Sequence, residues 1–309
     1  MSKRIGILTT GGDCSGLNSV IRGAGLRAMA LGYTLLGIRR GFRGLSTTGL
    51  SKPDYFELDA SICDETMLLK SGSILLSDTK WMSAEIQKGR TVEDVKQSII
   101  DGYRQLKLDG LICVGGDGSL KLLNELTSNN DELRVIFVPK TIDNDVNYTD
   151  YAVGFQTSVK VAVEAIENIR STAKSHERTM IVEVMGRDAG FIALYAGLAS
   201  GADVILVPEF GYNLEKIKEA GFECRSVTLG HIQRGGETCI SDRLLGTLLG
   251  VEAINLISNG NFGKFLAFSE NKLRIMDIRE VVKNVNATLK IDDKYVNVAR
   301  DLGVYVGEF

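Results

Sequence analysis

Hydrophobic positions along the chain follow two alternating patterns. Short apolar runs rich in β-branched residues have the length and composition of buried strands. Between them lie segments in which apolar residues recur every three or four positions. In residues 91–106, for example, Val95, Ile99 and Tyr103 share one helical face, and Thr91 can cap the first turn. This alternation predicts an α/β fold with mainly parallel sheets covered by helices on both faces.

The elements follow directly from this pattern. The predicted strands are residues 4–8, 33–38, 110–114, 134–138, 179–184, 203–207, 226–230 and 265–268. The predicted helices lie near residues 17–30, 91–106, 119–127, 158–170, 189–200, 213–219, 241–258 and 276–285. A chain of 309 residues has room for two Rossmann-like domains. We place them at residues 1–150 and 151–309, with the C-terminal helix a candidate to return to the first domain.

Composition and charge narrow the class of protein. A formal net charge of −3 and the absence of long Lys/Arg runs argue against nucleic-acid binding, which usually needs a basic face. The five cysteines are scattered and fit neither a zinc motif nor a disulfide framework. No apolar stretch reaches the roughly 20 residues that span a bilayer. We therefore expect a cytoplasmic protein whose partners are small molecules rather than nucleic acid or membrane.

Two glycine-rich segments follow predicted strands and open predicted helices. Residues 11–18 (Gly-Gly-Asp-Cys-Ser-Gly-Leu-Asn) and 115–119 (Gly-Gly-Asp-Gly-Ser) can both present backbone N–H groups to a phosphate. Asp117 can hold Mg²⁺, which prefers one or two carboxylates together with substrate oxygens. Neither segment has the GxGxxG spacing of a dinucleotide site, which argues against a nicotinamide-dependent dehydrogenase.

Other polar groups follow the later strands. If residues 139–145 are extended, Thr141, Asp143 and Asp145 point the same way, and one carboxylate can take a hydroxyl proton while the other helps hold metal. Residues 185–188 and 231–236 follow two further strands. Arg178 and Arg225 lie near the starts of these strands, and arginine suits phosphate recognition. Taken alone, each arginine is better explained by a surface salt bridge, and their placement is what favours a site.

In combination, these motifs resemble those of the bacterial-type 6-phosphofructokinase family. The matching segments are residues 11–13, 115–119, 139–145, 185–187 and 229–236. They agree with the family in order and approximate spacing over nearly the whole chain, and the tail resembles cyanobacterial-like members. The resemblance implies a glycolytic kinase that transfers the γ-phosphoryl group of ATP to the 1-hydroxyl of fructose 6-phosphate, with Mg²⁺ as cofactor.

The resemblance also implies a role for individual residues. Asp143 is the base that activates the sugar hydroxyl, Thr141 and Asp145 support it, and Arg187 stabilises the transferring phosphoryl group. The implied donor-binding residues are Gly11, Gly12, Lys80, Gly116, Asp117 (also the metal ligand), Gly118, Ser119 and Lys140. The implied sugar-phosphate-binding residues are Arg178, Met185, Gly186, Arg225, His231 and Arg234. In the family the arginines at the positions of Arg178 and Arg225 reach from a neighbouring subunit, which implies a homo-oligomer, a tetramer or a dimer.

Two positions bear on the phosphoryl donor. Pyrophosphate-using members typically carry an aspartate at the position of Gly118 and a lysine at that of Lys140, whereas typical ATP users have glycine at both. Because Gly118 leaves room for the α-phosphate, we expect ATP, and a pyrophosphate-dependent enzyme is the alternative. A second alternative is a non-catalytic regulatory paralogue. The intact Asp117, Asp143 and Arg187 argue against it, because such a paralogue would not need them together.

The chain departs from the family pattern between Glu209 and Arg225. The family has an extra helix–strand–helix there, including a glutamate that contacts the sugar, and no equivalent glutamate can be assigned here. The sequence near Glu219 and Ala220 reads like two family segments placed end to end. Lys80 occupies a region where the family often has an arginine, and it supplies positive charge without bidentate geometry.

Overall fold

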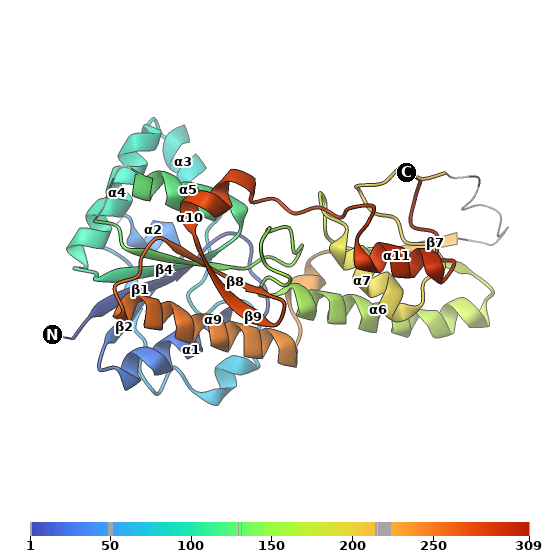
Figure 1. The fold of residues 1–309 in the computed structure, drawn as a ribbon, viewed down its shortest axis with the longest axis horizontal. Helices are drawn as coiled ribbons and strands as arrows, with labels where there is room; N and C mark the ends of the chain where they lie inside the picture. The colour runs from blue at the N-terminus through green and yellow to red at the C-terminus, as the bar shows by residue number, and fades with distance from the viewer. Residues whose placement is uncertain are drawn as a thin grey trace.

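The computed structural model describes residues 2–48, 52–128, 130, 132–213, 215 and 224–308. It consists of a larger and a smaller body that lie side by side (Figure 1). The larger body contains a seven-stranded sheet, and the smaller one contains a two-stranded sheet. The prediction of an α/β fold with mainly parallel sheets is confirmed. No described helix is long and apolar enough to cross a membrane.

The large sheet has the strand order β3-β2-β1-β4-β5-β8-β9. In that order its strands are Tyr55–Glu57, Thr34–Ile38, Arg4–Thr9, Gly110–Gly115, Val135–Pro139, Lys264–Ser269 and Lys272–Asp277. The five central strands are parallel, and the two edge strands, β3 and β9, pair antiparallel with their neighbours. The carboxyl ends of β1, β4 and β5 therefore meet at one edge, where ligands of such sheets bind.

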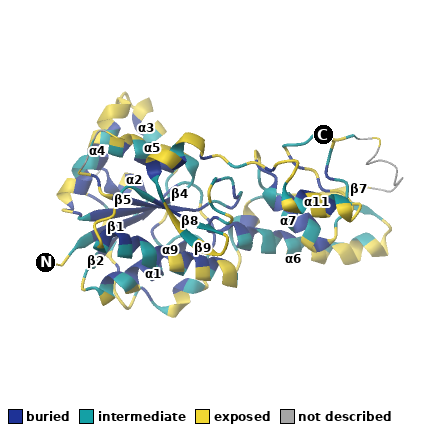
Figure 2. Cartoon of the chain, in the orientation of Figure 1, coloured by how far each residue is buried: buried dark blue, intermediate teal, exposed yellow. Residues whose placement is uncertain are grey.

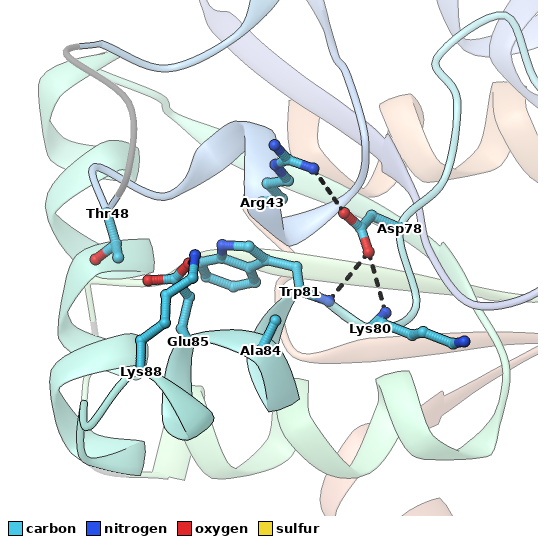
Figure 3. Close-up of a pocket in the computed structure, with 8 residues that line it drawn as sticks. All are labelled: Arg43, Thr48, Asp78, Lys80, Trp81, Ala84, Glu85 and Lys88. Atoms are coloured by element: carbon cyan, nitrogen blue, oxygen red, sulfur yellow. Dashed lines mark hydrogen bonds and ion pairs between the residues drawn. The ribbon is translucent and has the colours of Figure 1, made fainter.

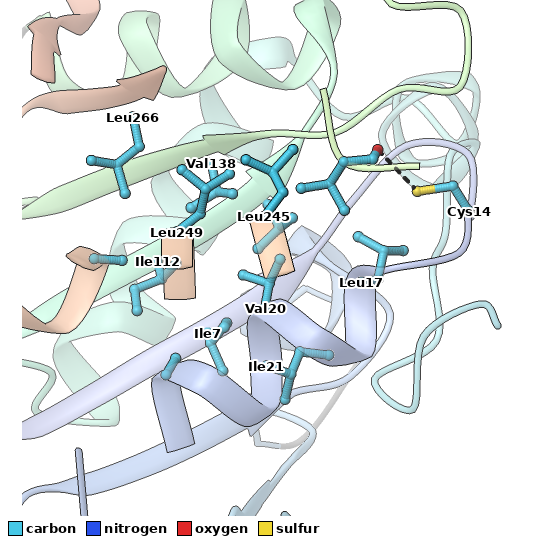
Figure 4. Close-up of a cluster of buried hydrophobic side chains, with 14 of the residues drawn as sticks. Ile7, Cys14, Leu17, Val20, Ile21, Ile112, Val138, Leu245, Leu249 and Leu266 are labelled. Carbon is cyan, nitrogen blue, oxygen red and sulfur yellow. Dashed lines mark hydrogen bonds between the residues drawn. The ribbon is translucent and has the colours of Figure 1, made fainter. Parts of the chain in front are cut away.

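Both faces of this sheet are covered by helices. Ile7 and Ile112 point to the side of α1 (Leu17–Ala30) and α9 (Ile240–Ser258), whereas Leu8 and Leu111 point to the opposite side. The opposite face is covered by α4 (Val92–Gln105) and α5 (Asp117–Ser128). Burial on both sides explains why these strands are continuous apolar runs (Figure 2). Figure 4 shows the apolar cluster on the side of α1 and α9.

Helices α1 and α9 lie unusually close together. A Cβ atom at Gly250 would meet the Val20 carbonyl oxygen at 2.2 Å, and one at Gly23 would meet the Thr247 carbonyl oxygen at 2.6 Å. Glycine at these positions therefore allows the two backbones to touch. Helix α9 and strands β8 and β9 therefore belong to the larger body, although they lie within residues 151–309, the range predicted for the second domain.

The smaller body has a core of its own. It is built from α6 (Phe155–Ser175), α7 (Phe191–Ser200), α11 (Lys294–Asp301) and the parallel strands β6 (Thr179–Glu183) and β7 (Cys224–Thr228). Buried residues of this core come from α7, α11 and the segments between and after them; they include Leu194, Ile205, Val296 and Val306.

Several predicted elements differ from the structure. Residues 203–207 do not form a strand: their only described β-pairing is a bridge between Val204 and Tyr305, because no neighbouring strand offers a longer ladder. The predicted helix 276–285 is split into β9, α10 (Ile278–Val281) and a 3₁₀ turn (Val282–Asn284). The predicted helix 213–219 falls mostly outside the described residues. Short elements missed by the pattern are β3, β9, α2 (Phe42–Leu45), α3 (Trp81–Gln87) and α11, together with the 3₁₀ turns Glu65–Leu68 and Gly230–Arg234.

The buried carboxylate of Asp242 on α9 joins the two bodies, alongside apolar residues such as Phe155 and Ile192 that share a core cluster with α1 and α9. Its Oδ1 accepts a hydrogen bond from the Gly154 amide at 2.9 Å, and its Oδ2 accepts bonds from the Thr157 amide at 2.8 Å and hydroxyl at 2.6 Å. The carboxylate thus satisfies free N–H groups at the start of α6. Burial raises the pKa of Asp242, and the hydrogen bonds from Thr157 and Gly154 partly offset this rise.

Removing this carboxylate is expected to be costly. In Asp242→Ala, three buried donors lose their acceptor, so the free energy of unfolding should fall by roughly 3 kcal/mol or more. Chemical denaturation followed by circular dichroism measures the change. The control is Asp293→Ala, which removes the Asp cap of α11 and should cost only about 1 kcal/mol. Equal losses in both variants would contradict a special role for Asp242.

Candidate active site at the carboxyl ends of the strands

The two glycine loops and the β5 connection meet at the carboxyl edge of the large sheet. The Thr10 amide donates to the Val114 carbonyl at 2.9 Å, and the Lys140 amide donates to the Gly115 carbonyl at 2.9 Å. Ser119 and the Lys140 ammonium both lie within 4 Å of the position that a Cβ atom at Gly11 would occupy. The structure thus brings together the predicted donor-binding residues of three different strand ends.

Lys140 is the buried cation of this site. Its residue is only 5% exposed, and its ammonium donates a hydrogen bond to the Gly12 carbonyl. Burial lowers the pKa of Lys140, and the nearby guanidinium of Arg234 adds to that effect. A cation held in this way stabilises the conformation of the first glycine loop and adds positive charge behind it.

Arg234 approaches the same loop from the other side. It lies in η2 (Gly230–Arg234), after β7, yet its Nη1 atom would lie 2.4 Å from a Cβ atom at Gly12 and is 3.7 Å from the Asp13 carboxylate. Its Nε atom is buried and has no hydrogen-bond partner among the described residues. Glycine at position 12 therefore lets the Arg234 guanidinium lie directly against the first glycine loop.

Thr141, Asp143 and Asp145 also lie at this edge, but the segment is not extended. Asn144 has a φ of 54°, in the left-handed region, and its side chain bonds the Asp150 carbonyl and the Ala152 amide. The extended geometry expected for residues 141–145 is therefore wrong, because this buried asparagine turns the chain. Thr141 Oγ1 accepts from the Asp143 amide at 3.1 Å.

Asp143 is the most perturbed carboxylate of the site. Burial, and after it the Asp145 carboxylate, raise the pKa of Asp143 to about 6 against the opposing effect of the cations Arg234 and Lys140. The Oδ1 atom of Asp143 is buried and has no partner among the described residues. A carboxyl group in this state can exchange a proton near neutral pH and has an acceptor position open.

The β6 end contributes Met185, Gly186 and Arg187. Gly186 has a φ of 109°. Arg187 lies on the surface with its side chain 90% exposed, and it bonds the neighbouring Asp188 carboxylate at 2.6 and 2.9 Å. The Asp188 carboxylate, and more weakly that of Asp143, raise the pKa of Arg187, which places the guanidinium within electrostatic range of the site.

One residue of this loop escaped the sequence interpretation. Gln233 is 1% exposed, and its Oε1 accepts a hydrogen bond from the Met185 amide at 2.7 Å. It therefore ties the loop after β6 to the loop after β7. An uncharged glutamine gives no periodic or charge signal, so only its place between His231 and Arg234 could have indicated it.

Arg178 and Arg225 lie at the opposite end of the small sheet. Arg225 pairs with Met180 at the start of β7, and Arg178 immediately precedes β6. A five-residue strand, roughly 16 Å long, separates them from the loops that carry Met185 and the exposed His231. Within one chain the structure does not bring these arginines to the rest of the site.

The second glycine loop leads into α5. Asp117 is the first residue of this helix, is 39% exposed at its side chain, and pairs with Lys121 at 3.1 Å. No described atom lies within 4 Å of the position of a Cβ atom at Gly118, and the nearest one to Gly116 is the Lys140 carbonyl oxygen at 3.7 Å. No group of three His, Cys, Asp or Glu side chains in the described part of the chain could hold a metal by itself.

Comparison with known proteins decides the family. A family model described as Phosphofructokinase matches residues 4–220 and again residues 214–257, which together cover most of the chain. This chain belongs to the phosphofructokinase family. The two matches overlap at residues 214–220, where the sequence itself reads like two joined segments.

Individual relatives agree with this. An "ATP-dependent 6-phosphofructokinase 1" of Nostoc sp. is 38% identical over 363 aligned positions, with 99% of both chains covered. A "Pyrophosphate--fructose 6-phosphate 1-phosphotransferase" of Dictyoglomus thermophilum is 36% identical, covering 93% of this chain and 96% of its own. The structure of phosphofructokinase from Saccharomyces cerevisiae is similar with a TM-score of 0.80 and 25% identity, over 91% of this chain and 45% of the yeast chain. The phosphofructokinase of Nostoc carries residues that this chain lacks, because the alignment is longer than 309 residues.

The raised pKa of Asp143 predicts a pH-dependent gain of stability on neutralising it. The folded protein favours the protonated carboxyl, so wild-type stability is lost as pH rises from about 3.8 through about 6. Asp143→Asn should therefore raise the free energy of unfolding by roughly 2 kcal/mol at pH 8 and by nothing below pH 4. Thermal melts across this range without ligands measure it.

Asp59→Asn is the control for the direction of this change in the free energy of unfolding. Hydrogen bonds from Ser61 and Ile62 lower the pKa of Asp59, so Asp59→Asn should lower stability at neutral pH, and the loss should disappear in acid. If Asp143→Asn behaves like Asp59→Asn, the carboxyl of Asp143 is not held in its protonated form by the fold.

Proposed function

We propose that this chain transfers the γ-phosphoryl group of ATP to the 1-hydroxyl of fructose 6-phosphate, giving fructose 1,6-bisphosphate. The observation that carries the proposal is Asp143: a half-buried carboxyl with a pKa raised to about 6 and an unpartnered Oδ1, at the edge where both glycine loops converge. Relatives named ATP-dependent 6-phosphofructokinase align over the whole chain. Phosphoryl transfer needs this arrangement of a base beside a phosphate-binding loop.

Asp143 acts as the general base in this proposal. Its carboxylate accepts the proton of the sugar 1-hydroxyl while the hydroxyl oxygen attacks the γ-phosphorus and the bond to the leaving phosphate breaks. Thr141 holds the Asp143 backbone through their 3.1 Å hydrogen bond, and burial, with the Asp145 carboxylate second, keeps the pKa of Asp143 high. Arg187 can leave the exposed Asp188 carboxylate to meet the transferring phosphoryl group.

Mg²⁺ is the proposed cofactor, and the residues present fit it. Mg²⁺ usually takes one or two protein carboxylates and completes its shell with water and phosphate oxygens, so a cluster of three acidic groups is not required. Asp117, exposed at the start of α5, is the proposed ligand. When bound, the ion neutralises charge on the donor phosphates. The backbone N–H groups of Gly116, Gly118 and Ser119 would face the same phosphates.

The sugar phosphate is proposed to bind on the side of the smaller body. Met185, Gly186, His231 and Arg234 come from the loops after β6 and β7, and the buried, unpartnered Nε of Arg234 is one open donor there. The remote placement of Arg178 and Arg225 supports their action from a neighbouring subunit. We infer a homo-oligomer, a tetramer or a dimer, whose sugar sites are shared; sedimentation of the intact chain tests this, and a monomer with full activity would contradict it.

ATP is the proposed donor, with pyrophosphate as the second candidate. The open space at Gly118 leaves room for the further phosphate of a nucleotide. Lys140, the lysine shared with pyrophosphate users, is occupied in bonding the Gly12 carbonyl, so it shapes the loop rather than filling the donor site. The pyrophosphate-dependent relative keeps the second candidate open to experiment.

A cytoplasmic location is also proposed. All five cysteines are free thiols within the described residues. Burial raises the pKa of Cys14 to about 12 and that of Cys63 to about 11, so both side chains behave as inert core residues. Unpaired cysteines of this kind are typical of proteins in a reducing compartment.

Neutralising the base should abolish turnover. In Asp143→Asn, kcat should fall by roughly 10²–10⁴-fold, with a much smaller change in KM for fructose 6-phosphate. The wild-type rate should rise with pH through about 6, where the carboxyl ionises. A coupled assay with fructose 6-phosphate, Mg²⁺ and ATP measures both. Near-normal kcat in a folded variant would show that another group is the base.

A single substitution tests the donor. Gly118→Asp adds a carboxylate in open space and in the first turn of a helix, where an acidic residue is favourable, so the variant should fold. Its charge should repel the nucleotide phosphates, and kcat/KM for ATP should fall sharply, while that for pyrophosphate is penalised much less. Steady-state kinetics with both donors measure this. A wild type that prefers pyrophosphate would overturn the donor assignment.

A further inference from the structure

The segment from Ser77 to Trp81 leads into helix α3 and contacts the first glycine loop. The Ser77 hydroxyl donates a hydrogen bond to the Gly11 carbonyl, which anchors one end of the segment to the donor loop. At the other end, Trp81 begins α3. Lys80 lies between the anchors with an exposed side chain, and no carboxylate of the described residues forms an ion pair with its ammonium. Its charge is therefore available to an anion.

The far anchor depends on one carboxylate, that of Asp78. Its Oδ1 accepts hydrogen bonds from the backbone amides of Lys80 and Trp81, both at 3.0 Å, and its Oδ2 accepts one from Arg43 Nη1 at 3.0 Å (Figure 3). Burial alone would raise the pKa of Asp78, but the bonds from Arg43 and from the two amides lower it below its ordinary value. The carboxylate is therefore charged near neutral pH and fixes the backbone of Lys80 directly.

Arg43 is itself held beside the donor loop. It belongs to the short helix α2, which follows Gly41 at the carboxyl end of β2. A Cβ atom at Gly41 would lie 3.0 Å from the Thr9 carbonyl oxygen, so the start of α2 packs directly on the strand that leads into the first glycine loop. Through its hydrogen bond, Arg43 thus ties Asp78 to this end of the sheet.

Packing alone does not fix this segment. A cavity of about 230 Å³ borders it and is lined by Arg43, Thr48, Asp78, Lys80, Trp81, Ala84, Glu85 and Lys88. On that side Asp78 and Lys80 face open volume instead of packed side chains. The polar bonds of Asp78 therefore help to decide where Lys80 stands.

We propose that Arg43 and Asp78 form a positioning pair that holds Lys80 at the phosphates of the donor, a role that rests on the proposed function of the site. Neither residue needs to touch the donor. Asp78 fixes the Lys80 backbone, and Arg43 fixes Asp78. The pair serves the donor half of the reaction only, because Asp78 holds the segment that Ser77 ties to the first glycine loop.

The test separates the two substrates. In Asp78→Ala, KM for ATP should rise roughly 3- to 30-fold, the size typical of a lost cap bond, with KM for fructose 6-phosphate unchanged. Asp78→Asn keeps an oxygen for the two amides and should recover most of the loss. Arg43→Ala should raise KM for ATP less, and adding it to Asp78→Ala should have little further effect, because both act through one contact.

Asp64→Ala is the matched control. It removes a similar carboxylate cap, from the Thr66 amide, at a 3₁₀ turn away from the donor loop, and should leave both KM values unchanged. Equal rises of both KM values in Asp78→Ala, or no recovery in Asp78→Asn, would overturn the positioning role.

Calorimetric titration of ATP with Mg²⁺ into the intact wild type and into Asp78→Ala distinguishes failure of the positioning pair from failure of the proposed function. A wild type that binds ATP but does not phosphorylate fructose 6-phosphate refutes the function, and weaker binding by the variant still supports the pair. An active wild type with equal ATP affinity in the variant refutes the pair alone.

Discussion

The buried carboxylate of Asp242 is the interaction on which the arrangement of the whole site depends. It is anchored on α9, which is fixed to the large sheet through backbone contact with α1, and it holds the first turn of α6, which leads into the smaller body. The loops after β6 and β7 are therefore set relative to the glycine loops by these buried hydrogen bonds, for which an unpaired partner would be expensive. Apolar residues of the smaller body, such as Phe155, Ile192 and Leu229, add to this because they share one core cluster with α1 and α9.

The active-site chemistry follows from how the same edge is charged. Parallel strands bring three loops together at this edge. Burial there raises the pKa of Asp143, and the positive charges of Arg234 and Lys140 lower it. The balance of these effects leaves the pKa of Asp143 at about 6. Neither cation could be replaced without changing the loop geometry as well, because one bonds the Gly12 carbonyl and the other packs on Gly12.

Much of this could be predicted from the sequence, because strand ends in a parallel sheet converge whatever the details. The meeting of the glycine loops and Asp143 at one edge was predicted in this way, whereas Lys140 was named through the family resemblance. What could not be predicted depends on single tertiary contacts. Asn144 turns a segment that looked extended, Val204 lacks a ladder partner, and Gln233 carries no pattern at all. The exposed state of Arg187 likewise reflects its local pairing with Asp188.

The two-stranded sheet of the smaller body has a consequence for dynamics. Most side chains of β6 and β7 are exposed or half-buried, whereas β4 and β5 are buried throughout. Regions with few buried apolar contacts open locally at a small fraction of the global free energy. Amide hydrogens of β6 and β7 should thus exchange far faster than those of β4. If the loops of this half bind the sugar phosphate as proposed above, the entropy of ordering them would fall on that substrate rather than on the nucleotide.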